Sequence, residues 1–311
     1  MRVVLLAGGT GGAKLAHGLQ QVLAAGELTV IANVADDTER FGLLVCPDID
    51  TILYTLAGLA DAEQGWGVRG DTATALGMLE RYGEEAWFRI GDADLATHVR
   101  RNQLLRAGSS LTEATAAMAA ALGVPSHLVP ATDQRVRTMV QTDAGELDFQ
   151  TYFVRRGQSD EVRGLRLDGI EAAQPSPAAL DALGTADLVV IGPSNPLVSI
   201  GPILAIPGMR QAVLDAPGAR VGVSGIVAGQ ALRGPADRML ASLGHEVSAR
   251  GVARLYAGIV DRFVIDEADA ELGPSIALLD MAVSVLPTVM RTDADRAALA
   301  TEIVALGAER S

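Results

Sequence analysis

The chain opens with an apolar strand, a glycine-rich loop and a helix, an order that restricts it to a small set of folds. Arg2 to Leu6 is an apolar run typical of a strand buried inside a parallel sheet. Gly8 to Gly12 contains four glycines, and Ala13 to Ala25 has the leucine spacing of an amphipathic helix. Leu28 to Asn33 is a second apolar strand. Strand, helix and strand form a βαβ unit, which predicts an α/β protein.

The second half of the chain repeats this rhythm. Strands are predicted at Ala186 to Ile191, Arg220 to Val223 and Arg262 to Ile265, and each is followed by a loop with polar or glycine residues. We therefore expect an open, mostly parallel, Rossmann-like sheet. Sheets of this kind bind ligands outside the carboxyl ends of their strands, where these loops would lie.

Two regions differ from this rhythm. Residues 52–130 contain almost no strand signal and predict helices at Thr72 to Arg81, Asp94 to Leu105 and Leu111 to Leu122. Asp143-Ala144-Gly145 is a hairpin signal between Val136 to Thr142 and Glu146 to Val154, with a further strand at Val162 to Leu167. The expected organisation is an α/β core from residues 1–51 and 131–311, with a helical insertion at 52–130 and a small β-hairpin region.

Composition excludes several classes of function. The net charge of −13 over 311 residues argues against binding to nucleic acid or to an anionic membrane by bulk attraction. No apolar run reaches the roughly 20 residues needed to span a bilayer. Cys46 is the single cysteine, so no intrachain disulfide can form. We expect a cytoplasmic protein that binds neither nucleic acid nor membrane.

The glycine loop predicts contact with a phosphate. Backbone N–H groups of Gly8, Gly9, Thr10, Gly11 and Gly12 at a helix start form an anion site. The only lysine, Lys14, stands at the end of this loop. The loop lacks the Gly-Lys-Ser/Thr of a P-loop, and Lys14 occupies the third glycine of the dinucleotide fingerprint. A tight turn with no ligand is the alternative.

Four carboxylates follow on the next loops and predict a metal site. Asp36, Asp37, Asp48 and Asp50 fall within fifteen residues near the glycine loop of the expected fold. Carboxylates of this kind hold a hard cation such as Mg²⁺ against a phosphate. Each also has a structural alternative, because aspartates favour turns, cap helices and stabilise helix N-termini.

Other polar groups at expected strand ends are candidates for substrate contact. Ser194 and Asn195 lie in a stiff loop framed by prolines, and an asparagine amide can bind a nucleobase edge. Arg89 and Asp92 precede or begin a predicted helix. A Pro-framed turn and a helix cap are the alternatives for these two groups. The sequence suggests no Ser-His-Asp set and no zinc spacing.

Six ordered motifs resemble one enzyme family, the 2-phospho-L-lactate transferases of deazaflavin coenzyme F(420) biosynthesis. They extend over almost the whole chain and are GGTGGAKL (8–15), NVADDT (33–38), CPDIDTILYTLAG (46–58), GDADLATH (91–98), GPSNP (192–196) and GPAD (234–237).

The resemblance implies a reaction and a set of roles. The donor would be a guanosine diphosphate carrying lactate, enolpyruvate or glycerate on its distal phosphate, and the acceptor the ribityl hydroxyl of the deazaflavin Fo. GMP would leave, Mg²⁺ would be required, and the protein would be a homodimer. Residues 52–130 would form part of the acceptor site. The list of implied roles is: phosphate binding by Gly8 to Gly12 and Lys14; Mg²⁺ or ribityl binding by Asp36, Asp37, Asp48 and Asp50; proton acceptance by Asp50 or Asp48; Fo binding by Arg89 and Asp92; and guanosine or phosphate binding by Ser194 and Asn195.

Two other functions remain open at this stage. A related group of proteins with this fold binds nucleotide-sugars and acts in regulation without catalysis. An NAD-type oxidoreductase is disfavoured by the broken glycine fingerprint. The run from Pro47 to Tyr54 favours the transferase, and Asp50→Asn is predicted to abolish transfer while leaving the fold intact.

Overall fold

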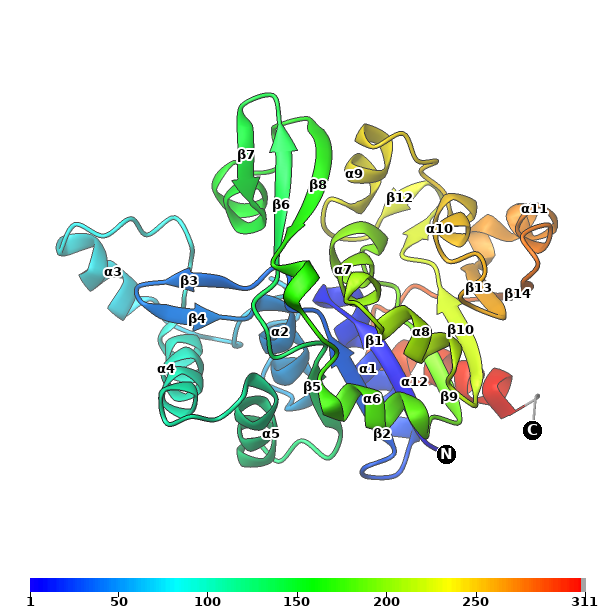
Figure 1. Cartoon of the computed structure of the whole chain (residues 1–311), viewed down its shortest axis with the longest axis horizontal. Coiled ribbons are helices and arrows are strands. Elements are labelled where there is room, and N and C mark those ends of the chain that lie inside the picture. The colour runs from blue at the N-terminus through cyan, green and yellow to red at the C-terminus, as the bar shows by residue number, and fades with distance from the viewer. Residues whose placement is uncertain (309–311) are drawn as a thin grey trace.

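The computed structural model describes residues 1–308 and is built on one seven-stranded parallel sheet (Figure 1). The strand order is β14-β13-β10-β9-β1-β2-β5, and every neighbouring pair is parallel. Their bounds are β1 Val3–Ala7, β2 Leu28–Ala32, β5 His127–Pro130, β9 Leu188–Ile191, β10 Ala219–Val223, β13 Arg262–Asp266 and β14 Ala282–Leu286. The predicted α/β class with an open, parallel, Rossmann-like sheet is confirmed.

Helices cover both faces of this sheet because alternate strand residues point to opposite sides. Val3 and Leu5 of β1 pack in one core, and Val4 and Leu6 pack in the other. The first core takes α1 Gly9–Val22, α2 Pro47–Leu56, α5 Leu111–Ala121 and α12 Asp293–Ala308. The second takes α6 Pro177–Gly184, α7 Gly201–Ala205, α8 Met209–Leu214, α9 Ala236–Ser242, α10 Ala249–Leu255 and α11 Gly273–Ala277.

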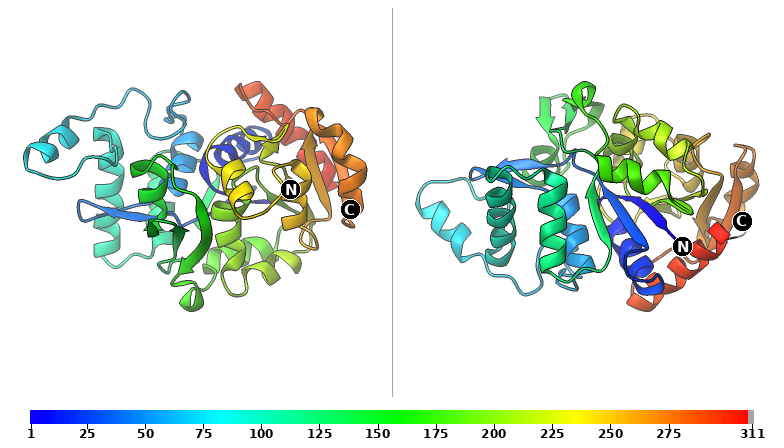
Figure 2. Two further views of the ribbon diagram at one scale, coloured as in Figure 1. Left: turned by 90° about the horizontal axis from the view of Figure 1, so that it is seen from above. Right: turned by 60° about the horizontal axis from the view of Figure 1, so that its bottom comes forward.

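Two groups of elements lie outside these layers. Helices α3 Thr74–Arg81 and α4 Asp92–Arg106 stand with α5 on one side of the molecule, in cyan and teal in Figure 2. A three-stranded antiparallel sheet, β6 Arg137–Thr142, β7 Gly145–Asp148 and β8 Val162–Asp168, projects from the main sheet (Figure 1). Two hairpins, β3 Thr38–Arg40 with β4 Leu43–Val45 and β11 Ile226–Val227 with β12 Gln230–Ala231, complete the strands.

The structure corrects four local predictions. β5 forms the edge of the main sheet although its residues fall in the stretch expected to lack strands. The β3–β4 hairpin and β14 were not predicted, because their runs are short or partly polar. Thr151–Arg155 is a π-helical turn rather than the end of a strand, since a carboxylate oxygen of Asp148 accepts the Thr151 N–H at 3.1 Å and starts the turn. The division of the chain at residues 51/52 and 130/131 stays a prediction.

No helix within residues 1–308 is long and apolar enough to cross a membrane.

Candidate active site

The glycine turn between β1 and α1 is packed against two neighbouring loops. The Gly8 N–H donates to Ser194 Oγ at 3.1 Å, and the Gly9 N–H donates to Asp48 Oδ1 at 2.5 Å. A Cβ on Gly11 would lie 2.2 Å from the Pro193 carbonyl oxygen. This close approach requires glycine at position 11, as the alternative of a tight turn predicts. The next N–H groups of α1 have no partner inside the helix and still form an anion site.

A small cavity of about 60 Å³ lies beside the first turn of α1. Its lining includes Thr10, Gly11, Lys14 and Arg233. The Lys14 Nζ donates to the Met290 carbonyl oxygen at 2.9 Å, and burial with the nearby Arg296 and Arg233 charges lowers the pKa of this lysine. Two cations and a helix N-terminus at one cavity favour an anionic ligand.

The loop of residues 61–70 contacts two residues that line this cavity, Thr10 and Arg233. The Thr10 hydroxyl donates to the Gly65 carbonyl oxygen at 2.9 Å. Arg233 donates to the carbonyl oxygens of Gln64 at 2.5 Å and Glu63 at 2.7 Å. These contacts join three segments that are distant in sequence and hold Thr10 and Arg233 in place.

Asp48 stands in the first turn of α2 and faces the glycine turn. It is 6% exposed, and Asn33 Nδ2 donates to its Oδ2 at 2.9 Å. Burial raises the pKa of Asp48 to about 6, against the lowering effect of hydrogen bonds from Asn33, Gly9 and Ser199. A carboxylate with a pKa near neutrality is suited to accept a proton during a reaction.

Asp50, two residues further along α2, is bound to a buried arginine. Both of its oxygens accept from Arg101 of α4, with Nη1 at 3.1 Å from Oδ2 and a second, shorter contact from Nη2 to Oδ1. Arg101 is fully buried, and the Asp50 carboxylate raises the pKa of its guanidinium although burial opposes this. A paired charge of this kind holds α2 and α4 together.

A chain of polar side chains extends from this pair. His98 Nδ1 lies 3.6 Å from Asp50 Oδ2, and His98 Nε2 lies 3.3 Å from Asp94 Oδ1. The Tyr54 hydroxyl donates to the same Asp94 oxygen at 2.7 Å. The network connects α2 to α4 and holds Asp50 in place. Of the four carboxylates predicted to bind a metal, Asp50 is therefore less free than the others to do so.

Asp36 and Asp37 follow β2 and have oxygens without partners. The Oδ1 atom of each is buried and makes no hydrogen bond with residues 1–308. Burial raises the pKa of both carboxyls well above the usual value, and for Asp36 the charges of Asp48 and Asp37 raise it further. Asp37 is partly compensated by the Cys46 thiol and the Arg101 charge, which lower its pKa, whereas no positive charge compensates Asp36, so a cation would stabilise Asp36 most.

A magnesium ion fits Asp36 and Asp37 better than it fits all four carboxylates. No three carboxylate, histidine or cysteine groups within residues 1–308 converge as a complete metal cage. Mg²⁺ keeps several waters and is usually held by one or two carboxylates together with substrate phosphates. The two unpartnered Oδ1 atoms supply that number of ligands, whereas Asp50 is already bound to Arg101.

The remaining predicted site residues have local partners or lie apart. Ser194 is buried and accepts from Gly8, while the Asn195 side chain caps the turn Pro196–Ile200 through the Leu197 N–H at 2.9 Å. Asp92 accepts from the Ala75 N–H at 2.8 Å and the Thr72 hydroxyl at 2.5 Å, and the Thr72 hydrogen bond helps to lower its pKa to about 2. Asp92 and the exposed Arg89 line neither the cavity beside α1 nor the larger one beside Asp36.

Apart from Lys14, sequence reasoning missed the basic residues of this site. Arg101 had a usable signal, because Asp94, His98 and Arg101 recur at helical spacing and form a buried polar stripe on α4. Arg40, Arg135 and Arg137 had none, since Arg40 lies in a short hairpin, Arg135 in an irregular segment and Arg137 at the start of β6, and their meeting depends on how these elements are arranged.

The fold and the site define an α/β protein with its ligand site at the carboxyl ends of parallel strands, where a helix N-terminus meets buried carboxylates. The model of the 2-phospho-L-lactate transferase CofD family matches residues 3–285. The chain belongs to this family, and it is a transferase of the phosphoenolpyruvate or 2-phospho-L-lactate type.

Individual relatives agree with this assignment. A phosphoenolpyruvate transferase of Streptomyces griseus is 42% identical, with 99% of each chain covered. A 2-phospho-L-lactate transferase of Methanopyrus kandleri is 40% identical, covering 98% of this chain and 97% of its own. A UPF0052-family protein of Bacillus halodurans superposes with a TM-score of 0.63 at 16% identity, over 97% of this chain and 98% of its own, and shares the fold.

Proposed function

We propose that this protein transfers a phospho-three-carbon-acid group from a guanosine diphosphate donor to the ribityl hydroxyl of Fo. The transferred acid would be enolpyruvate, lactate or glycerate. The hydroxyl oxygen forms a new bond to the distal phosphorus, the bond from that phosphorus to the bridging oxygen breaks, and GMP leaves with the electron pair. The observation that carries this proposal is the family match together with an anion site and uncompensated carboxylates on adjoining loops.

The nucleotide fits the side of the site formed by α1. The first turn of this helix offers N–H donors, and Lys14 and Arg233 add positive charge beside it. Ser194 accepts a hydrogen bond from the glycine turn, and the Asn195 side-chain oxygen accepts one from the adjacent loop. These two residues would contact guanosine through their remaining polar atoms.

The acidic side of the site would activate the hydroxyl and balance charge. Asp36 and Asp37 would hold Mg²⁺, which when bound neutralises charge on the diphosphate. Asp48 would accept the proton of the attacking hydroxyl, because its pKa of about 6 leaves it ionised near neutral pH. Asp50, the other predicted catalytic residue, would position α2 through Arg101 rather than exchange a proton.

One incubation tests the reaction. Purified protein, Fo and Mg²⁺ are combined with each of the three guanylyl donors, and products are followed by fluorescence-detected chromatography and mass spectrometry. We expect one donor to give two products in equal amounts, a phosphodiester of Fo and free GMP. A chelator should stop the reaction. Product that forms equally well with the chelator present would remove Mg²⁺ from the proposal.

A paired substitution tests the role of Asp48. Asp48→Asn should lower kcat by at least about 100-fold, in the range of lost general-base catalysis, and should remove the acidic limb of the pH–rate profile near pH 6. Asp181→Asn, an exposed position on α6, is the matched control and should keep the wild-type rate. Binding of a UDP-sugar without any affinity for Fo would favour a regulatory binding protein instead.

A further inference from the structure

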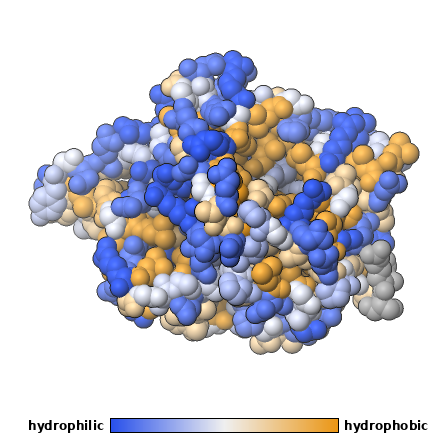
Figure 3. All heavy atoms as spheres, in the orientation of Figure 1, coloured by the Kyte–Doolittle hydropathy of each residue, from blue (hydrophilic) through white to orange (hydrophobic). Residues whose placement is uncertain are grey.

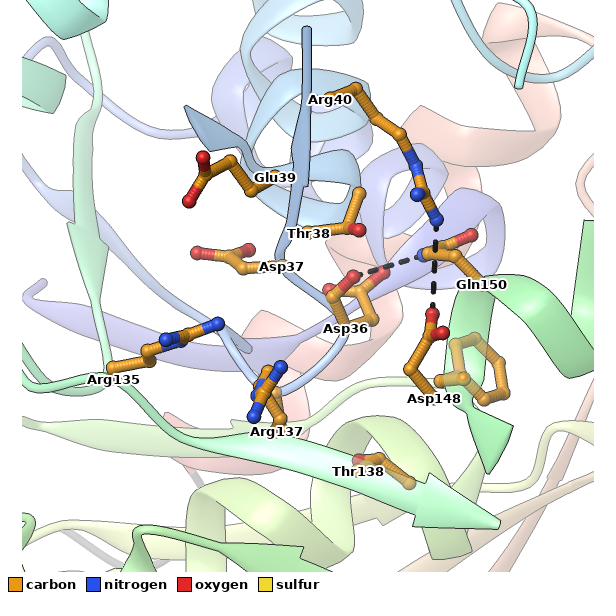
Figure 4. Close-up of a pocket in the computed structure, with 12 residues that line it drawn as sticks. Asp36, Asp37, Thr38, Glu39, Arg40, Arg135, Arg137, Thr138, Asp148 and Gln150 are labelled. Atoms are coloured by element: carbon orange, nitrogen blue, oxygen red, sulfur yellow. Dashed lines mark hydrogen bonds and ion pairs between the residues drawn. The ribbon is translucent and has the colours of Figure 1, made fainter. Parts of the chain in front are cut away.

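A second cavity lies beside Asp36 and is lined by both acidic and basic side chains. It has a volume of about 170 Å³, well above the roughly 10–15 Å³ that one water needs. Its walls come from the loop after β2, from β3, from the segment before β6 and from the end of β7 (Figure 4). Figure 3 shows hydrophilic residues gathered on the surface around this region, at the base of the small sheet.

Unpartnered polar atoms gather in this cavity. Buried side-chain atoms without a hydrogen bond to residues 1–308 include Asp36 Oδ1, Asp37 Oδ1, Arg40 Nε, Arg40 Nη2, Arg137 Nε and Thr138 Oγ1, and all of these residues line it. Leaving a buried donor or acceptor unpaired destabilises a protein, because the group loses its hydrogen bonds to water and gains none in return. A concentration of such atoms in one cavity therefore indicates a polar ligand.

The cations of the cavity are held in place but keep donors free. Arg40 stacks on the Trp87 ring at 4.1 Å and lies 3.8 Å from Asp148, beyond hydrogen-bond distance. Arg137 Nη2 donates to Asp168 at 3.1 Å, which leaves its Nε toward the cavity wall. Arg135 makes no hydrogen bond or ion pair with residues 1–308, and Figure 4 shows its guanidinium turned toward Arg137.

We propose that Arg135 and Arg137 bind the carboxylate of the three-carbon acid on the donor, an inference that rests on the proposed function. The loop after β2 connects the two places, because Asp36 lines this cavity and Asn33 of the same loop donates to Asp48, which accepts from the Gly9 N–H of the glycine turn. A donor whose diphosphate lies at α1 would therefore direct its distal substituent into the cavity. Guanidinium groups bind carboxylates in a planar, charge-assisted manner that neutral groups cannot replace.

The acidic residues of the cavity favour a monoanion over a phosphate. Asp36, Asp37, Glu39 and Asp148 line the same walls as the arginines. A phosphate carries up to two charges and would be repelled more strongly by them than a single carboxylate. The helix N-terminus and Lys14 provide the phosphate side of the site, so the two anionic ends of the donor have separate partners.

Calorimetric titration with three ligands tests this assignment without relying on turnover. The ligands are GDP, the lactate ester of GDP, and the ethyl ester of GDP, which lacks the carboxylate. Wild-type protein should bind the lactate ester about 10-fold more tightly than the ethyl ester. Arg135→Gln and Arg137→Gln should each reduce affinity for the lactate ester by about 10-fold and leave the other two ligands unchanged.

The controls separate this inference from the proposed function. Arg163→Gln removes an exposed arginine of β8 outside the cavity and should bind all three ligands like wild type. Arg135 has no partner to lose, so its variant should keep the wild-type melting temperature even if Arg137→Gln is less stable. Equal weakening of all three ligands would assign the arginines to the diphosphate, and unchanged affinity would exclude a role in binding; either result overturns the inference. Failure of wild-type protein to bind any guanylyl ligand would overturn the proposed function itself.

Discussion

Asp36 and Asp50 are buried carboxylates of the same site, and their charges are balanced in opposite ways. Asp50 has a fully buried arginine against both oxygens, whereas Asp36 has an oxygen with no donor and two further carboxylates nearby. Burial disfavours both charges, but only at Asp50 does another part of the protein recover the lost free energy. The comparison teaches that the Asp50 charge is already paired within the protein, whereas an Asp36 oxygen has no partner among residues 1–308.

The largest effect on stability is expected from removing the arginine that pairs with Asp50. Arg101→Met should lower the free energy of unfolding by about 3–5 kcal/mol, because it leaves Asp50 buried without its partner. Urea denaturation followed by circular dichroism measures the loss. Arg100→Met, the exposed neighbour on α4, should change stability by less than about 0.5 kcal/mol. Similar small losses in both variants would show that Asp50 does not depend on Arg101.

The same isosteric substitution should then have opposite signs at the two carboxylates. Asp50→Asn should destabilise the protein by about 3 kcal/mol, since Arg101 would remain buried without a counter-charge. Asp36→Asn should stabilise it by about 1 kcal/mol, since it removes an uncompensated charge while keeping the side-chain shape. Paired denaturation curves in metal-free buffer measure both, and a shared sign would contradict the comparison.

The prediction for Asp50 differs from the expectation drawn from sequence. Asp50→Asn was predicted to leave the fold intact, because the sequence places Asp50 in a family motif and gives no indication of its partner. Arg101 lies 51 residues away on a helix of the region expected to be an insertion. Which carboxylate receives the arginine depends on how α4 docks on α2, and this is a tertiary property.

Local patterns predicted more of the fold than of the site. The β1–α1–β2 unit, the helices α3 to α5 and the strands β9, β10 and β13 follow from apolar periodicity. The strand β5 and the hairpin of β3 and β4 did not, because short segments obtain their stability from neighbours rather than from their own sequence. The cavity arginines meet only after the chain returns from β5 to the edge of the site, so no spacing rule could assemble them.

The buried carboxyls with raised pKa values should make a contribution to stability that decreases as pH rises. The folded pKa values of Asp36, Asp37 and Asp48 are raised above that of an unfolded aspartate, about 3.9, with Asp48 at about 6. The folded state then holds more protons than the unfolded state, so these groups favour folding fully below about pH 4 and lose that contribution as pH rises through the folded values. Melting temperature measured from about pH 5 to about pH 7.5 should therefore show a declining contribution from these carboxyls.

Adding Mg²⁺ extends the measurement of melting temperature against pH, because the cation can bind the carboxylates after they have lost their protons. The gain in melting temperature on adding excess Mg²⁺ should be larger at about pH 7.5 than at about pH 5, since a cation binds the ionised carboxylates and stabilises the folded state by mass action. Asp36→Asn should reduce the gain, and Asp181→Asn should not. A gain that is independent of pH would argue against metal binding at these carboxylates.

The smallest effect on stability is expected at Tyr54, at the end of the polar network that extends from Asp50 and Arg101. Tyr54→Phe removes a hydroxyl that donates to Asp94 at 2.7 Å, and it should cost about 1 kcal/mol, the usual contribution of one hydrogen bond. His98 Nε2 lies 3.3 Å from the same oxygen but makes no hydrogen bond with residues 1–308, so the Tyr54 hydroxyl is the donor that this oxygen loses. Tyr82→Phe, at a position that is 79% exposed, is the matched control and should have no measurable effect. A loss at Tyr54 as large as that at Arg101 would mean that the network acts as one unit, and Asp50 would then depend on all of its members rather than on its arginine.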